Sequence, residues 1–220
     1  MNPILKRTLT GLCVAAVVIA AILFTPPCAV VPVIIALALL ATAEYALLMK
    51  RKFPRPTLAA ILAFLLGAAV VAGGFAMLAM TVGKYGNVMF LYVVAIIKFS
   101  DVGGFAFGLT SARLMQGGNH KMCPTISPNK SWEGMAGSIF LSCLVSCCFM
   151  PVTGFGLAKA LAFGLVAATV GTAGDLVESK FKRWVGVKDS SAMKITNGMG
   201  GLLDMFDSLL LAPAALYCFI

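Results

Sequence analysis

Long apolar runs constrain the fold of this chain more than any other feature. The stretch "LAAILAFLLGAAVVAGGFAMLAMTVG" (58–83) contains no charged residue, and a helix needs about 20 mainly apolar residues to cross a bilayer. Hydrophobic residues make up 60% of the sequence and charged residues 11%, whereas a soluble domain has about 25% charged residues. The sequence therefore predicts an integral membrane protein.

Separate apolar segments along the chain predict an all-α polytopic bundle of about seven transmembrane helices. Such a bundle would use most of the 220 residues and leave little room for a soluble domain. The first segment resembles a signal peptide because Lys6 and Arg7 precede it. We expect a helix there instead, because no clear small-residue cleavage site follows and "TPPCAVVP" has the composition of a turn. The segments span residues 9–25, 29–49, 57–82, 86–108, 134–153, 155–178 and 198–220.

The positive charge of the chain follows this topology. The formal net charge is +9, and 14 of the 17 Lys and Arg residues lie before the first helix or in the loops after helices 2, 4 and 6. Only Lys84 and Lys159 lie in the opposite loops, and Lys98 lies within a helix. This positive-inside pattern predicts a cytoplasmic N-terminus and an outer C-terminus. Basic loops at the cytoplasmic face favour anionic lipid headgroups, so we expect no nucleic-acid partner.

Polar residues are distributed unevenly, which suggests scaffold helices in residues 1–85 and a catalytic region with cytoplasmic loops in residues 86–220. The first three helices contain one carboxylate, Glu44, and small residues suited to close packing, such as "GAAVVAGG". An acid inside a membrane segment is a functional candidate. Glu44, however, lies near the cytoplasmic end of its helix, where Lys50 and Arg51 could neutralise it.

Two motifs open the predicted catalytic region. "KFSDVGGFAFG" places Lys98 and Asp101 in a helix rich in glycine, and "TISPNKSWEGMAG" leads into the next helix. In the second motif, Ser131 is suited to cap the helix N-terminus and Glu133 to interact with the positive end of the helix dipole. These motifs therefore indicate polar groups at the cytoplasmic ends of two helices.

Five of the eight acidic residues fall between residues 175 and 207. On the sixth helix, spacings of i, i+3, i+4 and i+7 put two acids, a serine and a lysine on one face. Two aspartates at i and i+3 lie on the seventh helix, after several cations and the glycine-rich "NGMGG". The sequence therefore predicts acids from two helices near one membrane surface. In chain order the residues are Asp175, Glu178, Ser179, Lys182, Asp204 and Asp207.

Three interpretations of these charges compete. An ion-paired bundle would have the acids neutralised by nearby cations such as Lys182 and Arg183. A proton or cation pathway would need acids at mid-bilayer depth on several helices, which only Glu44 and Asp204 weakly offer. A phosphoryl-transfer site needs carboxylates for a divalent metal, cations for polyphosphate, and glycines that let backbone N–H groups approach phosphate oxygens. All three ingredients occur together, which favours the phosphoryl-transfer interpretation.

The same stretch carries a family resemblance. "SKFKRWVGVKDSSAMKITNGMGGLLDMFD" closely resembles the signature of the phosphatidate cytidylyltransferases (CDP-diacylglycerol synthases), in which S-x-x-K-R and K-D precede H-G-G-x-x-D-R-x-D. "GDLVES", "SPNKSWEG" and Asp101 before a glycine-rich helix also look like family motifs, so the resemblance covers about residues 98–212. The positions that fit the signature are Ser179, Lys182, Arg183, Lys188, Asp189, Gly200, Gly201, Asp204 and Asp207.

The chain departs from this family pattern at several positions. Met199 replaces the histidine, Met205 the arginine of D-R-x-D, and Asn197 a proline. The A-Y-x-x-G-R motif that the family has near Asp101 is also altered, and Arg113 is a displaced candidate for its arginine. A weakened or inactive homologue is therefore an alternative to an active enzyme.

The resemblance implies that phosphatidic acid and CTP react to give CDP-diacylglycerol and pyrophosphate. A phosphate monoester is already anionic at neutral pH, since its second pKa is about 6, so no general base is required and the histidine is dispensable in principle. The task left to the protein is to neutralise and align two polyanions. Two further alternatives to cytidylyl transfer are a lipid kinase that uses CTP and a cation pathway protein.

We expect partners and a location that match this chemistry. The expected partners are CTP, phosphatidic acid and the lipid bilayer. The expected location is a bacterial cell (inner) membrane. The pocket would open to the cytoplasm and laterally to lipid. A homodimer is compatible with this interpretation. The expected cofactor is Mg²⁺, with a second metal or a monovalent cation left open. Its expected ligands are Asp175, Asp204 and Asp207.

The remaining site residues are expected in two groups. One group would hold phosphates or take part directly in the reaction, and the other would complete the substrate pocket. The first group is Asp175, Ser179, Lys182, Arg183, Lys188 and Asp189. The second group is Asp101, Ser127, Lys130, Glu133, Gly200 and Gly201.

Overall fold

The computed structural model describes residues 17–55, 57–116, 118–187 and 201–219, and it confirms the all-α class. Each predicted apolar segment corresponds to helical structure over the described part of the chain, but the helices that contain segments 86–108 and 155–178 continue to Leu114 and Val185. Residues 17–24 are helical. The other helices are α2 (Pro27–Lys52), α3 (Leu58–Leu114), α4 (Trp132–Cys148), the short α5 (Met150–Thr153), α6 (Leu157–Val185) and α7 (Leu202–Tyr217).

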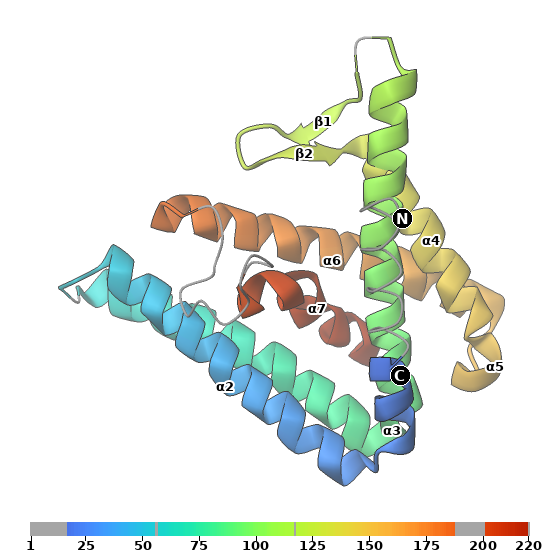
Figure 1. Ribbon diagram of the computed structural model, residues 1–220. Helices are drawn as coiled ribbons and strands as arrows, with labels where there is room; N and C mark the ends of the chain where they lie inside the picture. The colour runs from blue at the N-terminus through green and yellow to red at the C-terminus, as the bar shows by residue number, and fades with distance from the viewer. Residues whose placement is uncertain (1–16, 56, 117, 188–200, 220) are drawn as a thin grey trace, which may run out of the picture.

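A single glycine divides α3 into the two segments that the sequence predicts. Gly86 has φ 81° and ψ 176°, a conformation that side chains with a Cβ rarely adopt. The helix therefore changes direction at this residue without a loop. In Figure 1 its first arm lies beside α2, and its second arm, in green, lies beside α4.

Helices α6 and α7 pack between these two pairs (Figure 1). The apolar core contains aromatic side chains from several helices: the rings of Tyr92 and Phe163 are 5.3 Å apart, and Tyr92 and Phe149 are also 5.3 Å apart. The buried Tyr92 hydroxyl forms a hydrogen bond of 2.8 Å with Ser146. Core residues come from both 1–85 and 86–220, and the division of the chain at residue 85 stays a prediction.

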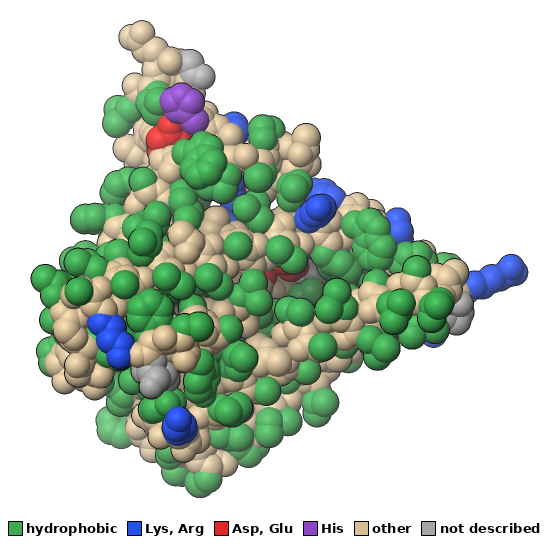
Figure 2. Space-filling view, turned by 180° about the vertical axis from the view of Figure 1, so that it is seen from behind, with side chains coloured by type: hydrophobic (Ala, Val, Ile, Leu, Met, Phe, Trp, Pro, Cys, Tyr) green, Lys and Arg blue, Asp and Glu red, His purple; other side chains and the backbone are tan. Residues whose placement is uncertain are grey.

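The outer surface fits a lipid environment. Among the described helices, α2, α3 and α6 are long and apolar enough to cross a membrane. Large apolar side chains are exposed on them, including Leu66 at 71% and Phe105 at 73%. Figure 2 shows hydrophobic side chains over most of one face of the molecule. In water such a surface would be strongly unfavourable, so the chain is an integral membrane protein.

A β-hairpin projects from the end of the bundle where the sequence predicts only a loop. Strand β1 (Lys121–Cys123) pairs antiparallel with β2 (Ser127–Ser131). The sequence pattern hides it because "SPNKS" contains no β-branched or aromatic residue. Strand β2 leads directly into α4, whose N-terminus is capped by Ser131 as predicted: its side chain accepts a hydrogen bond of 3.1 Å from the Gly134 N–H.

Close packing between α3 and α7 gives a first prediction. A Cβ at Gly74 would lie 2.5 Å from the carbonyl oxygen of Leu210, whereas a Cβ at the adjacent Gly73 would meet nothing within 4 Å. We expect Gly74→Ala to destabilise the protein by about 1–3 kcal/mol because α7 must shift. Gly73→Ala should be neutral or stabilising by up to about 1 kcal/mol. Thermal unfolding in detergent, followed by circular dichroism, checks this difference; equal melting temperatures would contradict the packing.

Candidate active site

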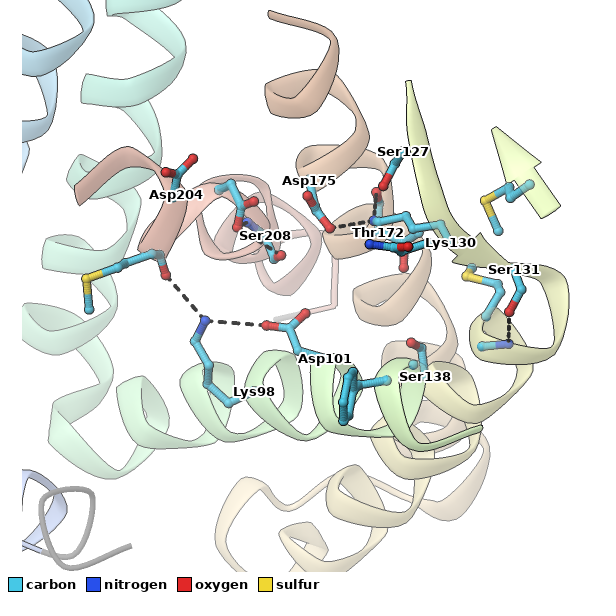
Figure 3. A pocket seen from close by; sticks show the side chains of 18 residues that line it. Lys98, Asp101, Ser127, Lys130, Ser131, Ser138, Thr172, Asp175, Asp204 and Ser208 are labelled. Carbon is cyan, nitrogen blue, oxygen red and sulfur yellow. Dashed lines mark hydrogen bonds and ion pairs between the residues drawn. The ribbon is translucent and has the colours of Figure 1, made fainter. Parts of the chain in front are cut away.

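A polar cavity of about 430 Å³ lies between α3, the β-hairpin, α4, α6 and α7 (Figure 3). Its charged residues, among those the structure describes, are two lysines and four aspartates. Serine, threonine and asparagine side chains, two glycines and three methionines complete much of the wall. The charged residues are Lys98, Asp101, Lys130, Asp175, Asp204 and Asp207.

Two ion pairs face each other across this cavity (Figure 3). On the α3 side, the Lys98 ammonium lies 3.4 Å from an oxygen of Asp101. On the opposite side, the Lys130 ammonium lies 2.7 Å from an oxygen of Asp175 and donates a hydrogen bond of 3.1 Å to the Thr172 carbonyl. The structure thus brings Asp101, Lys130 and Asp175 into one pocket, as the sequence predicts. Ser127 also lines it.

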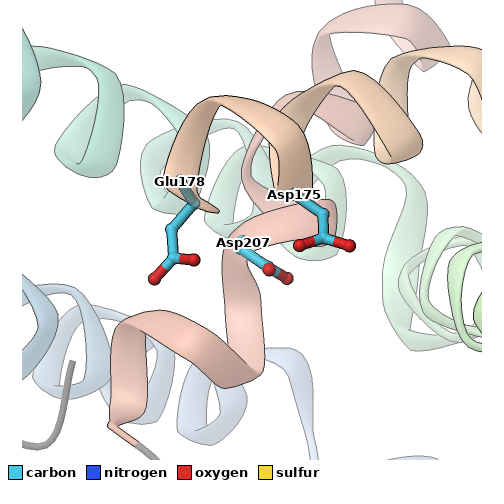
Figure 4. A group of neighbouring side chains, drawn as sticks. All are labelled: Asp175, Glu178 and Asp207. Atoms are coloured by element: carbon cyan, nitrogen blue, oxygen red, sulfur yellow. The ribbon is translucent and has the colours of Figure 1, made fainter. Parts of the chain in front are cut away.

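Three carboxylates form a cluster beside the cavity (Figure 4). Asp175 and Glu178 on α6 and Asp207 on α7 each place one oxygen within 4.8 Å of the others. Glu178 is only 7% exposed, and its Oε1 atom is buried without a hydrogen-bond partner. Carboxylate oxygens are the ligands that Mg²⁺ and Ca²⁺ prefer, and an orphaned buried oxygen is suited to such an ion. The donor set therefore fits a hard divalent cation.

The grouping of acids differs from the expected metal set of Asp175, Asp204 and Asp207. Glu178, rather than Asp204, completes the cluster. Asp204 lies in the first turn of α7, where it accepts a hydrogen bond of 2.9 Å from the Gly201 N–H. Its carboxylate also lies 2.6 Å from the Lys182 ammonium. Spacing along α7 could not distinguish these two aspartates, because their surroundings depend on how α6 and α7 pack.

Lys182 links the two helices rather than lining the polar cavity. Its ammonium lies 2.5 Å from an oxygen of Glu178 and 2.6 Å from an oxygen of Asp204, and its side chain is 15% exposed. For this residue the geometry is that of the ion-paired bundle considered above. Ser179 donates a long hydrogen bond of 3.4 Å to Asp175, while Arg183 is exposed; neither lines the cavity.

Glu133 also lies outside the residues that line the cavity. Its carboxylate lies 2.6 Å from the His120 ring and accepts the His120 backbone N–H, so it ties the start of the hairpin to α4. The hydrogen bond from His120 holds the pKa of the Glu133 carboxyl below its usual range. Arg113, the displaced arginine candidate, is exposed in the last turn of α3 and does not line the cavity.

Several predicted residues fall outside the described part of the chain. Gly201 is described and lies at the N-cap of α7. The residues outside it are Lys188, Asp189, Gly200, Asn197 and Met199.

The sequence interpretation missed other residues of the site. Lys98 lies within a helix three residues before Asp101, and this spacing is a signal that both side chains face one side. Asn129, Thr172 and Ser208 line the cavity without any charge that could have singled them out.

Glu44 has a defined role that its sequence position did not reveal. It is 2% exposed, and its Oε2 atom accepts a hydrogen bond of 2.9 Å from the Leu203 N–H. A carboxylate from α2 thus binds one of the unpaired N–H groups at the start of α7. It helps to hold the helix that carries Asp204 and Asp207.

This contact gives a second prediction. Glu44→Ala should destabilise the protein by about 1–3 kcal/mol, because a buried N–H loses its acceptor. Glu44→Gln keeps an acceptor oxygen and should lose less. Melting temperatures of the two variants in detergent test the order; an alanine variant as stable as the glutamine variant would contradict the capping role.

The fold and the site together define an integral membrane protein with a pocket suited to a divalent cation and phosphate groups. Comparison with known sequences gives the family. The Cytidylyltransferase family model matches residues 54–220, and the chain belongs to this family.

Curated relatives are consistent with this assignment. The chain is 41% identical over 122 residues to proteins named phosphatidate cytidylyltransferase from Staphylococcus aureus (strain COL) and Staphylococcus saprophyticus, and 42% identical to one from Staphylococcus epidermidis. Each match covers 54% of this chain and 44% of the relative. The matched region therefore spans less than half the length of these relatives.

Proposed function

We propose that this protein transfers the cytidylyl group of CTP to phosphatidic acid, giving CDP-diacylglycerol and pyrophosphate. The observation that carries the proposal is the carboxylate cluster beside a polar cavity that also contains two lysines. Family membership supports the reaction class, and the names of the curated relatives support the substrates. The resemblance of the signature motif to that of phosphatidate cytidylyltransferases supports them as well.

The charge balance of the cavity supports a requirement for metal. Two lysines and four aspartates among the described lining residues carry a formal charge of −2 when all are ionised. A triphosphate would be repelled by such a wall. A bound divalent cation would offset this charge of −2, and we propose Mg²⁺ held by Asp175, Glu178 and Asp207. When bound, Mg²⁺ would neutralise phosphate oxygens and withdraw charge from the α-phosphorus.

The side chains of the cavity have tasks that follow from their positions. The phosphate of phosphatidic acid is the nucleophile and attacks the α-phosphorus of CTP, and pyrophosphate leaves. The lysines would neutralise the phosphates and align them, which is the main requirement for phosphoryl and nucleotidyl transfer. Ser127 and Ser138, both lining the cavity, can donate hydrogen bonds to phosphate oxygens. No residue is needed to remove a proton from the nucleophile.

A neighbouring apolar groove supports a lipid substrate. This groove of about 310 Å³ lies between the first arm of α3, α6 and α7 and is lined mainly by apolar side chains such as Leu66, Val70 and Phe181. Asp207 lines both the groove and the polar cavity. A lipid whose acyl chain occupied the groove could therefore place its phosphate at the carboxylate cluster. Such a groove would provide the lateral access that a substrate with two acyl chains requires.

The orientation in the membrane is part of the proposal. Cations in alternate loops favour a cytoplasmic location for the cavity, where CTP is available. Bacterial relatives support a cell (inner) membrane as the location. The homodimer also remains a proposal.

Purified protein in detergent, given CTP, phosphatidic acid and Mg²⁺, provides the test. We expect release of pyrophosphate that depends on all three additions and stops when EDTA removes the metal. Pyrophosphate release without phosphatidic acid, or full activity in EDTA, would contradict the proposal. Cation flux into liposomes that needs no CTP would favour the pathway alternative.

A further inference from the structure

We propose that Lys98 is a phosphate-binding residue of the polar cavity and supplies the positive charge that residue 205 lacks. This inference rests on the proposed function, because it concerns a phosphate group of one of the two substrates. The charge would act either on CTP or on the headgroup of phosphatidic acid. Both present the same chemistry, an anionic phosphate oxygen.

The contacts of Lys98 leave it able to bind a ligand. Its ammonium lies 3.4 Å from an Asp101 oxygen and 3.3 Å from the Met205 carbonyl oxygen. Both distances are longer than the roughly 2.7–2.9 Å that is typical of charge-assisted hydrogen bonds. The side chain is 49% exposed, and an ammonium has three protons to donate. A phosphate entering the cavity can therefore reach it without first breaking a short ion pair.

The other described lysines near the site are held more tightly. Lys130 makes a 2.7 Å ion pair with Asp175 and is 20% exposed. Lys182 lies between two carboxylates at 2.5 and 2.6 Å and does not line the cavity. If either lysine moved to bind a phosphate, a short ion pair would break and a carboxylate would lose its cation. Lys98 is thus the most available of these three ammonium groups.

Residue 205 lies next to the Lys98 ammonium at the wall of the cavity. Met205 follows Asp204 on α7, lines the cavity and is 43% exposed. Its own side chain carries no charge, but the Lys98 ammonium is hydrogen-bonded to its carbonyl oxygen. The Lys98 ammonium on α3 therefore stands beside the α7 position where the family signature has an arginine. Figure 3 shows Lys98 directed toward this turn of α7 and toward Asp101.

A purely structural role for Lys98 would have different consequences. A half-exposed i, i+3 ion pair with Asp101 contributes little to stability, and its loss would not selectively change the binding of one substrate. A phosphate-binding role predicts a change in a binding constant that a cation from another position can restore.

The experiment compares Lys98→Met, Lys98→Arg and the double variant Lys98→Met/Met205→Arg with the wild type. Lys159→Met is the matched control, because Lys159 lies over the Phe155 ring, away from the cavity. KM is measured separately for CTP and for phosphatidic acid. Equilibrium binding of radiolabelled CTP, and of phosphatidic acid in mixed micelles, is measured without turnover.

We expect Lys98→Met to weaken the binding of one of the two substrates by roughly tenfold to a hundredfold. The affected substrate identifies the phosphate that Lys98 holds. Lys98→Arg and the double variant should recover most of the loss, and Lys159→Met should match the wild type. The inference would be overturned if the Lys98→Met variant had the same KM and binding constants as the wild type for both substrates. It would also be overturned if neither Lys98→Arg nor the double variant restored the lost binding. A wild type that binds both substrates but forms no CDP-lipid would contradict the proposed function alone, since the binding measurements would still test Lys98.

Discussion

Asp207→Asn is expected to lower cytidylyl transfer by about a thousandfold and to weaken binding of a divalent cation. Asp207 belongs to the three-carboxylate cluster and lines both the polar cavity and the apolar groove. The amide has nearly the same shape as the carboxylate, so packing should be preserved while one negative charge is lost. A bound metal contributes several kcal/mol to catalysis of this kind, and about 4 kcal/mol corresponds to roughly a thousandfold in rate.

The measurement combines turnover with binding of Mn²⁺ followed by electron paramagnetic resonance. Glu133→Gln is the comparison, because it makes the same chemical change at a carboxylate that pairs with His120 outside the cavity. We expect Glu133→Gln to keep most of the activity and all of the metal binding. An Asp207→Asn protein with unchanged activity and Mn²⁺ affinity would remove Asp207 from the metal site.

Lys182→Met is expected to destabilise the protein strongly, and far more than the same change at Lys180 on the same helix. Its ammonium lies between Glu178 and Asp204, whose side chains are 8% and 16% exposed. Removing one member of a buried ion-paired group typically costs about 3–5 kcal/mol, because a charge of the opposite sign is left uncompensated. The loss should also disturb the contact between α6 and α7, and thereby the carboxylate cluster.

Lys180→Met is the control for this prediction, since Lys180 is exposed on the same helix. Melting temperatures in detergent should fall clearly for Lys182→Met and hardly change for Lys180→Met. Equal melting temperatures for the two variants would mean that the ion pairs contribute little. Retained stability with lost activity would instead favour the original interpretation of Lys182 as a phosphate-binding residue.

The helices were the most predictable part of the fold. Apolar length dictates where a membrane helix can form, so the runs around Gly86 predicted two segments, and the structure has a helix with two arms there. The hairpin was not predictable in the same way. Strands of three and five residues with a proline and no β-branched residue give no periodic signal, and this one forms where the chain enters α4.

The site was predictable in composition but not in its pairing. Spacing along α6 placed Asp175 and Glu178 on one face, and the spacing on α7 did the same for its two aspartates. Which acids meet depends on how closely the helices approach. At Gly174 a Cβ would lie only 2.8 Å from the Asp207 carbonyl oxygen, so the absence of a side chain lets the two backbones come together there. That contact brings Asp207 to Asp175 and Glu178, while Asp204 meets Lys182.

The departures from the family signature now have a more specific meaning. Met205 lines the cavity, so the missing arginine concerns the pocket itself rather than a distant surface. Lys98 offers a cation at this point, and in the proposed reaction the phosphate nucleophile needs no base. Both methionines, Met199 and Met205, are therefore compatible with an active enzyme.

The fate of the individual phosphates of CTP tests the central claim most directly. The protein is incubated with phosphatidic acid and Mg²⁺ in parallel with CTP labelled at the α-phosphate and CTP labelled at the γ-phosphate, and the lipid is extracted. We predict that α-label enters the lipid fraction while γ-label is released in pyrophosphate. Transfer of γ-label to lipid would show a CTP-dependent lipid kinase, and the absence of both labels from the lipid would contradict cytidylyl transfer by this chain.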